Sequence, residues 1–365
     1  MDSREKYAGI LWGTAVGDSL GLPAEGMSRK KIEQRGWYNN WKHRLVLGRG
    51  MLSDDTEHTL MVVECLTAHP SDVHEFQRAL ANKLRWWLLA FPAGVGFATA
   101  RALLKLWIGF PSSRSGVFSA GNGPAMRSAI IGAYLSESPD NIESYVRAST
   151  ELTHTDPKAL VGALAVAYIA ATPDNISSCW RALEGLIRIE PTDWPRILDT
   201  LKIAVAENWS MDDYLVELRL GNGVTGYVYH TVPVVLFAWF KWHDSANMYS
   251  VSLTEVLNSG GDTDTTGAII GALSGARVGS INIPREWRSN IADWPRGASL
   301  IDGHVSALIK NEAATSPRWI FCLVRNLGFL VIILSHGFLR LFHWSRHRVL
   351  DPRSMSDTYR NSRNR

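Results

Sequence analysis

Apolar residues along this chain recur mostly at helical spacing, and few segments show the strict alternation of strands. Two segments, ALVGALAVAYIAA and TVPVVLFAWF, are apolar almost all round, which is typical of helices buried on every side. The pattern predicts an all-α fold. Clusters of glycine and proline separate the predicted helices at residues 91–96, 109–123, 189–194 and 221–226.

Two of the predicted helices carry glycine at every fourth position. Because residues four apart share a helix face, each helix presents a stripe without side chains. Glycine destabilises a helix interior by about 1 kcal/mol relative to alanine, so its repetition makes sense where another backbone must approach closely. We therefore predict two central glycine-striped helices; the alternative is chance clustering of small residues. The glycines are Gly9, Gly13, Gly17 and Gly21 in the first helix and Gly267, Gly271, Gly275 and Gly279 in the second.

Composition narrows the class of protein. With 365 residues, of which 46% are hydrophobic and 20% charged, the chain has a globular composition. Its 3 cysteines are too scattered for a zinc site and too few for a disulfide framework. The N-terminal residues lack the apolar core of a signal peptide, so a cytoplasmic protein is expected.

The net charge of +3 is unevenly distributed. From Ser316 onward the chain has nine arginines and two aspartates, which leaves the preceding body mildly acidic. A surface that neutralises nucleic-acid phosphates needs clustered lysine and arginine, so we expect no nucleic-acid partner for the body.

Several oxygen-rich turns adjoin the predicted helices, and each has an ordinary interpretation as a helix cap. Asp54 with Glu57 fits a capping box, Asp156 before Pro157 fits an N-cap, and Asp262 or Thr263 could cap the second glycine-striped helix. The turns supply Asp18 and Glu25; Ser53, Asp54 and Asp55; His154 and Asp156; and Asp262, Asp264 and Thr265.

Two of these turns contain more acid than a cap requires. SDDT and GGDTDTTG each place two aspartates beside hydroxyl groups at the start of an apolar helix. Such pairs repel each other unless a cation or wide exposure relieves them. Oxygen ligands without a cysteine or histidine cluster favour Mg²⁺, Mn²⁺ or Ca²⁺ over zinc, and their number suggests two ions.

A further glycine-rich turn, SAGNGPAMR, has no acid. Exposed amides at Gly121, Asn122 and Gly123, with Arg127 one turn on, could bind an anion such as a diphosphate; a plain tight turn is the alternative. Tyr227, after a flexible loop, could stack on a base, although aromatic residues at helix starts more often belong to the core.

In this order, the turns resemble those of the ADP-ribosylglycohydrolase family. The matching motifs are GTAVGDSLGLPAE, SDDT, GNGPAMR, LTHTDP, TGYVYHTV and SGGDTDTTGAIIGAL, within residues 8 to about 280. The resemblance implies an orthogonal multi-helix fold with a binuclear Mg²⁺ site, Mn²⁺ being the alternative. It also implies hydrolysis of the N-glycosidic bond between ADP-ribose and a protein arginine.

The resemblance further implies roles for individual residues. The implied metal ligands are Ser53, Asp54, Asp55, Asp262, Asp264 and Thr265. Catalytic roles fall to Asp55, Glu25 and Asp264, although spacing does not show which carboxylate accepts a proton from water. Gly121, Asn122, Gly123 and His154 would line the ADP-ribose cleft, with Tyr227 on the adenine side.

The sequence departs from the family pattern at two places. Ser53 stands where many members have threonine, which preserves the hydroxyl ligand. The segment 91–100 has no acid, whereas some members carry one there. The missing acid leaves the detailed mechanism open. The alternative functions are a hydrolase for another linkage, such as ADP-ribosylserine, or for another nucleotide, and a non-catalytic protein that binds ADP-ribose or blocks a transferase.

The C-terminal part differs in character from the body. We predict a catalytic domain over residues 1–314, an apolar and basic helical segment over 315–350, and a disordered tail over 351–365. Between Arg325 and Arg340 only 14 residues are free of charge, short of the roughly 20 that span a bilayer. A helix at the membrane surface is one expectation, and a helix packed on the body or a partner is the other.

Overall fold

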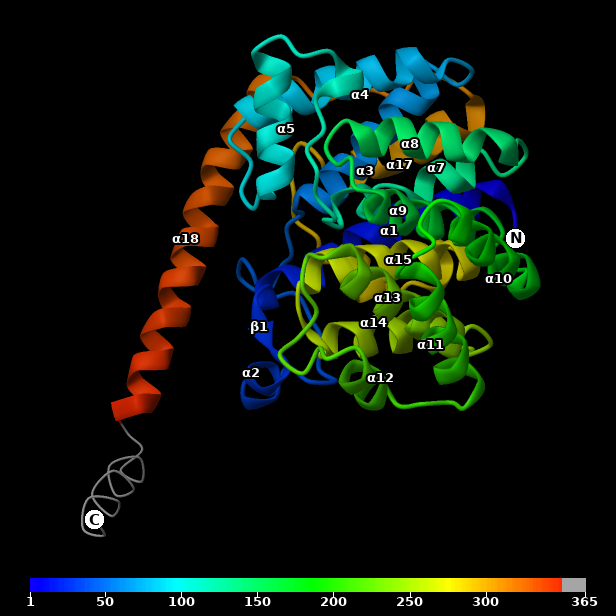
Figure 1. Ribbon diagram of the computed structural model, residues 1–365. Helices are drawn as coiled ribbons and strands as arrows, with labels where there is room; N and C mark the ends of the chain where they lie inside the picture. The colour runs from blue at the N-terminus through cyan, green and yellow to red at the C-terminus, as the bar shows by residue number, and fades with distance from the viewer. Residues whose placement is uncertain (350–365) are drawn as a thin grey trace, which may run out of the picture.

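The computed structural model describes the backbone of residues 1–349 and the side chains of residues 1–335. The predicted tail, 351–365, lies outside the described residues. Most of the described chain is helical, as predicted, with a single two-stranded ribbon in residues 1–349 (Figure 1).

Two glycine-striped helices form the centre of the fold. Helix α1 (Ser3–Gly21) and helix α15 (Thr263–Val278) lie against each other along their length. A Cβ atom added to Gly13 would lie 2.1 Å from the carbonyl oxygen of Gly271, and one added to Gly17 would lie 1.9 Å from that of Gly267. The two backbones are therefore in direct contact, which confirms the prediction from the glycine spacing.

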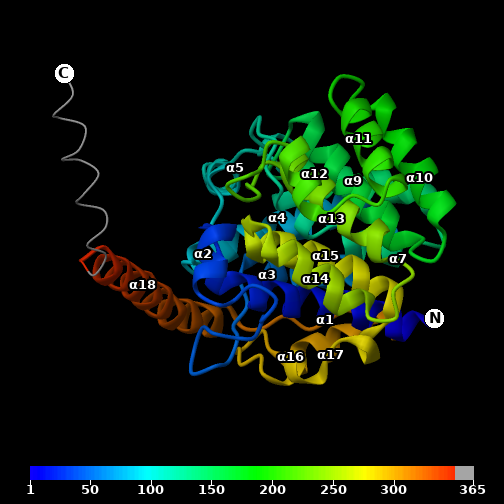
Figure 2. The same ribbon diagram turned by 90° about the horizontal axis from the view of Figure 1, so that it is seen from below.

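Further helices surround this pair on all sides. Helices α3 (Asp54–Ala68) and α17 (Ala298–Lys310) pack on α1, whereas α13 (Val228–Trp242) and α14 (Met248–Asn258) pack on α15 (Figure 2). Helix α9 (Pro157–Ala171) contacts α13, α15 and α7 (Ala129–Tyr134), which explains why its sequence is apolar on nearly every face.

The outer helices are amphipathic or short. In α4 (Val73–Leu89), for example, Phe76, Leu80, Leu84 and Trp87 form the buried stripe. The others are α2 (Arg29–Gln34), α5 (Phe97–Trp107), α6 (Gly123–Met126), α8 (Ile142–Glu151), α10 (Ile176–Gly185), α11 (Trp194–Ala206), α12 (Met211–Glu217) and α16 (Arg285–Ser289). Short 3-10 helices are η1 (Leu22–Ala24), η2 (Ser112–Arg114), η3 (Pro139–Asn141), η4 (Leu186–Arg188) and η5 (Ser280–Asn282).

The two-stranded ribbon joins the ends of the central helices. Strand β1 (Met27–Ser28), which follows α1, pairs antiparallel with β2 (Gly260–Gly261), which precedes α15. A third segment, the loop before α13, contacts the ribbon through Val224. Gly261 has φ +86, and a Cβ atom there would lie 1.9 Å from the carbonyl oxygen of Val224, so this loop can pack only against glycine. The ribbon thus brings the loops after α1, before α13 and before α15 to one place.

Helix α18 (Trp319–Val349) leaves the body at a steep angle, as Figure 1 shows. Its first half packs on the body through the buried residues Cys322, Asn326 and Phe329, which recur at helical spacing. Within the part of the chain that the structure describes, no helix combines the length and apolar character needed to cross a bilayer.

Candidate functional site

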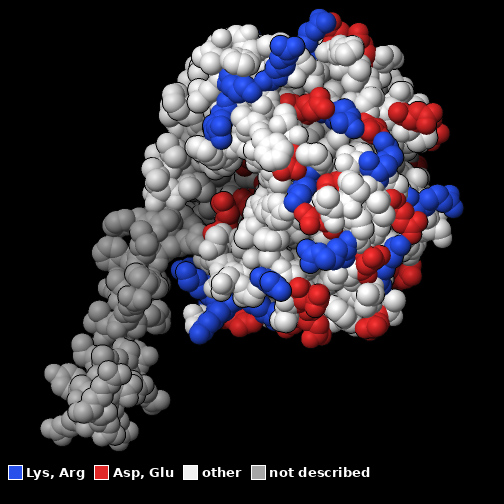
Figure 3. Space-filling model, in the orientation of Figure 1, with Lys and Arg blue, Asp and Glu red and all other residues white. Residues whose placement is uncertain are grey.

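A cavity of about 660 Å³ opens where the N-termini of α3 and α15 approach each other. Figure 3 shows acidic side chains recessed in a hollow on this face of the molecule, beside α18. Residues from seven parts of the chain form the wall. The lining residues include Glu25, Asp54, Thr99, Gly121, Asn122, Gly123, Met126, His154, Thr225, Asp262, Asp264 and Thr265.

The turn before α3 is held by hydrogen bonds that leave Asp54 pointing into the cavity. Ser53 is the N-cap, and its Oγ accepts from the Asp55 amide at 3.3 Å and donates to Asp55 Oδ2 at 3.0 Å. The buried Asp18 carboxylate accepts from the Ser53 amide at 2.9 Å and from Thr56 Oγ1 at 2.5 Å. The turn is therefore braced from α1.

This geometry corrects the capping-box interpretation of Asp54 and Glu57. The N-cap is Ser53, and the Glu57 side chain turns inward, where it accepts from Trp87 Nε1 at 2.5 Å and pairs with Arg296 at 3.0 Å. By contrast Asp156 caps α9 as expected, since its carboxylate accepts from the Lys158 amide at 2.9 Å.

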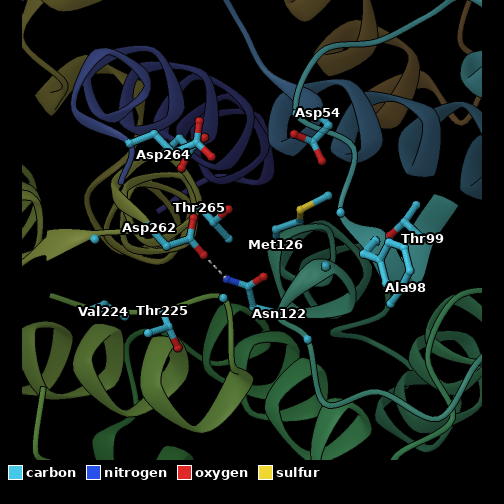
Figure 4. A pocket seen from close by; sticks show the side chains of 18 of the residues that line it. Asp54, Ala98, Thr99, Asn122, Met126, Val224, Thr225, Asp262, Asp264 and Thr265 are labelled. Carbon is cyan, nitrogen blue, oxygen red and sulfur yellow. Dashed lines mark hydrogen bonds between the residues drawn. The ribbon is translucent and has the colours of Figure 1, made fainter. Parts of the chain in front are cut away.

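The turn before α15, unlike those before α3 and α9, makes no side-chain capping bond, which corrects the interpretation of Asp262 or Thr263 as a cap. Asp262 occupies the N-cap position but makes no side-chain capping bond. Its Oδ2 instead accepts from Asn122 Nδ2 at 2.6 Å, as Figure 4 shows. Thr265 Oγ1 donates to Asp55 Oδ2 at 3.2 Å, which links the two acidic turns directly.

Figure 4 shows how the acids are arranged: Asp54 lies on one side of the cavity, and Asp262, Asp264 and Thr265 lie on the other. Asp55 and Ser53 are buried behind this wall, at 1% and 4% exposure, and are not among the residues that line it.

Burial and mutual repulsion make these carboxylates hard to ionise. Burial raises the pKa of Asp264 well above its usual value, and the charges of Glu25, Asp262 and Asp55 raise it further. The pKa of Asp55 is raised in the same way, first by burial and then by Asp54, Asp18 and Asp262. Asp54 likewise has a raised pKa because of burial, then Asp18 and Glu57. A cation between the two sides would relieve this repulsion.

Two carboxylate oxygens at the site also lack partners. Asp55 Oδ1 and Asp264 Oδ1 are buried without a hydrogen bond to any described atom. Buried acceptors of this kind are normally satisfied, so both atoms are available to a ligand. In residues 1–335 no group of three acidic, histidine or cysteine side chains is arranged to enclose an ion alone. The donor set, all oxygen and including two hydroxyls, nevertheless fits Mg²⁺ or Mn²⁺.

Opposite the acids, backbone groups and one histidine form the wall. His154 is 3% exposed, and its Nδ1 lies 2.9 Å from Thr153 Oγ1. Burial, with a smaller effect of Arg127, lowers the pKa of His154 to about 3, so its ring is neutral at physiological pH. A Cβ atom at Gly121 would lie 2.7 Å from His154 Nε2, so the turn needs glycine for this approach.

One sequence interpretation at this wall needs correction, and a second is not decided by the geometry. Arg127 is fully buried and bonds to Ser149 and Thr153, so it does not present its charge to an anion in the cavity, and Met126 lines the cavity instead. Tyr227 lies outside the residues that line the cavity, and its ring packs on Tyr229. Its adenine-side role stays a prediction.

The structure also gives roles to residues for which the sequence predicts no role, or a different one. The sequence predicts no role for Asp18, whose carboxylate accepts a hydrogen bond from the Ser53 amide at 2.9 Å. Asn122 lines the cavity, and its side chain also donates to Asp262 at 2.6 Å and to Thr231 at 3.0 Å, which the sequence does not predict. Thr99 lines the cavity from the first turn of α5, which no motif marks, and Thr225 lines it from the first position of the TGYVYHTV motif, which gives this threonine no role. For Asn122 and Thr225, the signal in the sequence is a polar residue within a glycine-rich loop.

Comparison with known proteins places these observations in a family. The model of the ADP-ribosylglycohydrolase family matches residues 1–316. The chain is 26% identical to the ADP-ribosyl-[dinitrogen reductase] glycohydrolase of Rhodospirillum rubrum, over 79% of this chain and 90% of that protein. It is 24% identical to the ADP-ribosylarginine hydrolase Tri1 of Serratia proteamaculans, over 82% of this chain and 79% of that protein.

The fold has a counterpart among solved structures. An ADP-ribosylglycohydrolase-related protein complex superposes with a TM-score of 0.56 and 24% identity, covering 86% of this chain and 99% of that chain. This likeness supports the all-α fold.

Proposed function

The chain belongs to the ADP-ribosylglycohydrolase family, and on this premise we propose that it hydrolyses the N-glycosidic bond between ADP-ribose and a protein arginine with Mg²⁺. The observation that carries the proposal is the pair of acidic turns facing each other across the 660 Å³ cavity, with two buried carboxylate oxygens unpartnered. The names of the two bacterial relatives support a protein-linked ADP-ribose, and one of them specifies arginine.

The proposed metal ligands are Ser53, Asp54, Asp55, Asp262, Asp264 and Thr265, with two Mg²⁺ ions or Mn²⁺ in their place. Bound ions would supply a Lewis acid for ribose oxygens and for an attacking water. Asn122 would hold Asp262 in orientation through its 2.6 Å hydrogen bond, and Asp18 would hold the Ser53 amide.

The acceptor for the water proton must face the cavity. Asp54, Asp264 and Glu25 line it, whereas Asp55 lies behind Thr265. The catalytic role predicted for Asp55 therefore remains a prediction, and a cavity-lining carboxylate is the better-placed proton acceptor. His154, neutral at physiological pH, can accept or donate a hydrogen bond at the wall without adding charge.

One experiment tests the reaction and its cofactor. The protein is incubated with mono-ADP-ribosylated arginine and mono-ADP-ribosylated serine substrates, with Mg²⁺ and with a chelator, and free ADP-ribose is measured. We expect release from the arginine substrate that stops on chelation and returns with Mg²⁺ or Mn²⁺.

Other results would change the proposal in defined ways. Release from the serine substrate but not from the arginine substrate would show that the protein is a hydrolase for ADP-ribosylserine instead of ADP-ribosylarginine. Release that a chelator does not reduce would exclude a metal-dependent mechanism. Binding of ADP-ribose without release from either substrate would favour the non-catalytic alternative.

We also propose that the protein acts in the cytoplasm and touches a membrane surface through α18. The outer side of this helix exposes Val324, Leu327, Val331 and Leu334, each at least half accessible. The segment that contains it is rich in arginine, which would favour anionic lipid.

Vesicle co-sedimentation tests the membrane proposal. Because the inner side of α18 packs on the body, exposed positions are the ones to change, and we expect V331S/L334S to lower partitioning onto anionic vesicles roughly tenfold. Equal partitioning of the wild-type protein and the V331S/L334S variant would exclude membrane contact through the exposed side of α18. A partner protein would then be the remaining candidate to cover this side.

A further inference from the structure

Arg325 of α18 reaches from outside the family-matched region to the turn that carries the acids. The match ends at residue 316, and Arg325 lies nine residues later. Its side chain is nonetheless only 6% exposed, although it belongs to a helix that otherwise extends away from the body. A buried arginine needs partners for a charge and a fork of N–H donors.

Its main partners are the Asp293 carboxylate and a backbone carbonyl, while Nη1 donates to Asn326 Oδ1 at 3.1 Å and lies 3.8 Å from Glu57 Oε1. Arg325 Nε donates to Asp293 Oδ1 at 3.0 Å, and Nη2 donates both to Asp293 Oδ2 and to the carbonyl oxygen of Leu52 at 2.5 Å. Asp293, which is 1% exposed, accepts in turn from the Leu52 amide at 2.9 Å. The backbone of Leu52 is thus bound on both its N–H and its C=O.

Leu52 directly precedes the acidic turn. The peptide group between Leu52 and Ser53 has its carbonyl bound by Arg325 and its N–H bound by Asp18 at 2.9 Å. With both edges fixed, the plane of this peptide cannot rotate without breaking a charge-assisted hydrogen bond. The orientation of this plane determines where the chain enters α3, and hence where Asp54 points.

The residues next to Arg325 hold a second wall of the cavity. Asn326 is fully buried and donates to the carbonyl oxygen of Ala90 at 3.0 Å. Phe329 packs with Leu22 and Met51, and Ala93 lies against the same cluster. Ala90 and Ala93 precede Gly94 and Gly96, which line the cavity. One face of α18 therefore contacts the segments on two sides of the site.

We propose that Arg325 is a positioning residue for the metal-bearing turn, and that α18 is a structural part of the active site rather than an appendage. Arg325 does not line the cavity, so it acts through Leu52 and Ser53. The inference rests on the proposed function for its activity readout but not for its metal-binding readout. Lysine cannot replace arginine here, because one ammonium cannot serve two carboxylate oxygens and a carbonyl with the geometry of the guanidinium fork.

The test is a titration of the full-length protein with Mn²⁺ in the absence of substrate, in which electron paramagnetic resonance measures the bound metal. We expect R325K to raise the Kd for Mn²⁺ at least about tenfold, in line with the loss of other groups that orient metal ligands. We also expect kcat to fall by a similar factor while KM for the ADP-ribosylated substrate changes less than about threefold. R318K is the matched control, because it makes the same substitution at an exposed arginine directly before α18. This variant should behave as wild type.

A second variant separates positioning from folding. D293N/R325Q removes both buried charges together, which avoids leaving Asp293 ionised without a partner. It should melt close to wild type in chelator and still bind Mn²⁺ at least about tenfold more weakly, because the Leu52 carbonyl loses the guanidinium fork. Mn²⁺ affinity within twofold of wild type in either folded variant would overturn the inference.

The proposed function can fail separately. Wild-type protein that binds Mn²⁺ but releases no ADP-ribose would remove the hydrolase proposal and leave the effect of Arg325 on Mn²⁺ affinity in force. Wild-type protein that binds no Mn²⁺ would overturn both.

Discussion

Replacing Asp264 with asparagine is expected to lower turnover at least about a hundredfold while leaving the metal-free protein as stable as wild type or more stable. The substitution keeps the size of the side chain and removes one negative charge. In the metal-bound protein that charge would face the ion, so its removal should reduce activity and metal affinity.

The expected gain in metal-free stability follows from the raised pKa of Asp264. A carboxyl whose pKa is higher in the folded than in the unfolded protein binds protons more tightly when folded, so its ionised form destabilises the fold at neutral pH. Asparagine removes this cost, which burial and the charges of Glu25, Asp262 and Asp55 create.

Two melting curves and one activity assay test the prediction. Wild-type protein should melt at a higher temperature with Mg²⁺ than with chelator, because saturation at a hundred times Kd contributes about 2.7 kcal/mol. The Asp264→Asn variant should show little or no such gain. Asp72→Asn, which alters an exposed cap of α4 that asparagine can replace, is the control. A variant that keeps both its activity and its Mg²⁺-induced shift would show that Asp264 is not a ligand.

The second large effect is expected at the glycine contact between α1 and α15. Gly13→Ala should lower the free energy of unfolding by at least about 3 kcal/mol, or prevent folding. The added Cβ would lie 2.1 Å from the Gly271 carbonyl oxygen and 2.7 Å from its carbon, both backbone atoms of a buried helix. No side chain can move aside, so the two helices must separate.

Separation of these helices would also reach the site, because α1 carries Asp18 and α15 carries Asp264. We therefore expect any folded Gly13→Ala protein to bind Mg²⁺ more weakly than wild type. Urea unfolding gives the stability, and the Mg²⁺-induced melting shift gives the effect on the site.

Gly303→Ala in α17 is the control for this substitution. Gly303 is exposed, helical and has no atom within 4 Å of an added Cβ, so alanine should stabilise the protein by up to about 1 kcal/mol through helix propensity. If the free energy of unfolding falls for Gly13→Ala and rises for Gly303→Ala, the loss at Gly13 is due to the backbone contact between α1 and α15. A loss below about 1 kcal/mol at Gly13 would show that the helices can readjust.

Much of the site was accessible from the sequence because its signals are local. The spacing of Gly9, Gly13 and Gly17 predicts a close helix contact whatever the rest of the chain does. The excess of acid in SDDT and GGDTDTTG likewise predicts a cation from residues adjacent in the chain. The structure brings these two turns together, linked by the hydrogen bond from Thr265 to Asp55.

Where sequence reasoning failed, the deciding interaction was distant in the chain. Arg127 follows a glycine-rich turn, which suggested an anion site, but its side chain is drawn inward by Ser149 and Thr153 on and after α8. Glu57 has the spacing of a capping box, but Arg296 and Trp87 bind it instead. Each alternative is sterically open to an isolated segment, so only packing selects between them.

The sequence by itself determined the helical class, the two glycine-striped helices and the residue types of the acidic turns, because each follows from periodicity or from adjacent residues. The tertiary structure alone decided which carboxylates face the cavity, which way Arg127 points, and that Arg325 of α18 binds the backbone beside Ser53. These outcomes depend on hydrogen bonds and buried charges between segments up to 273 residues apart, and no local pattern specifies such pairs.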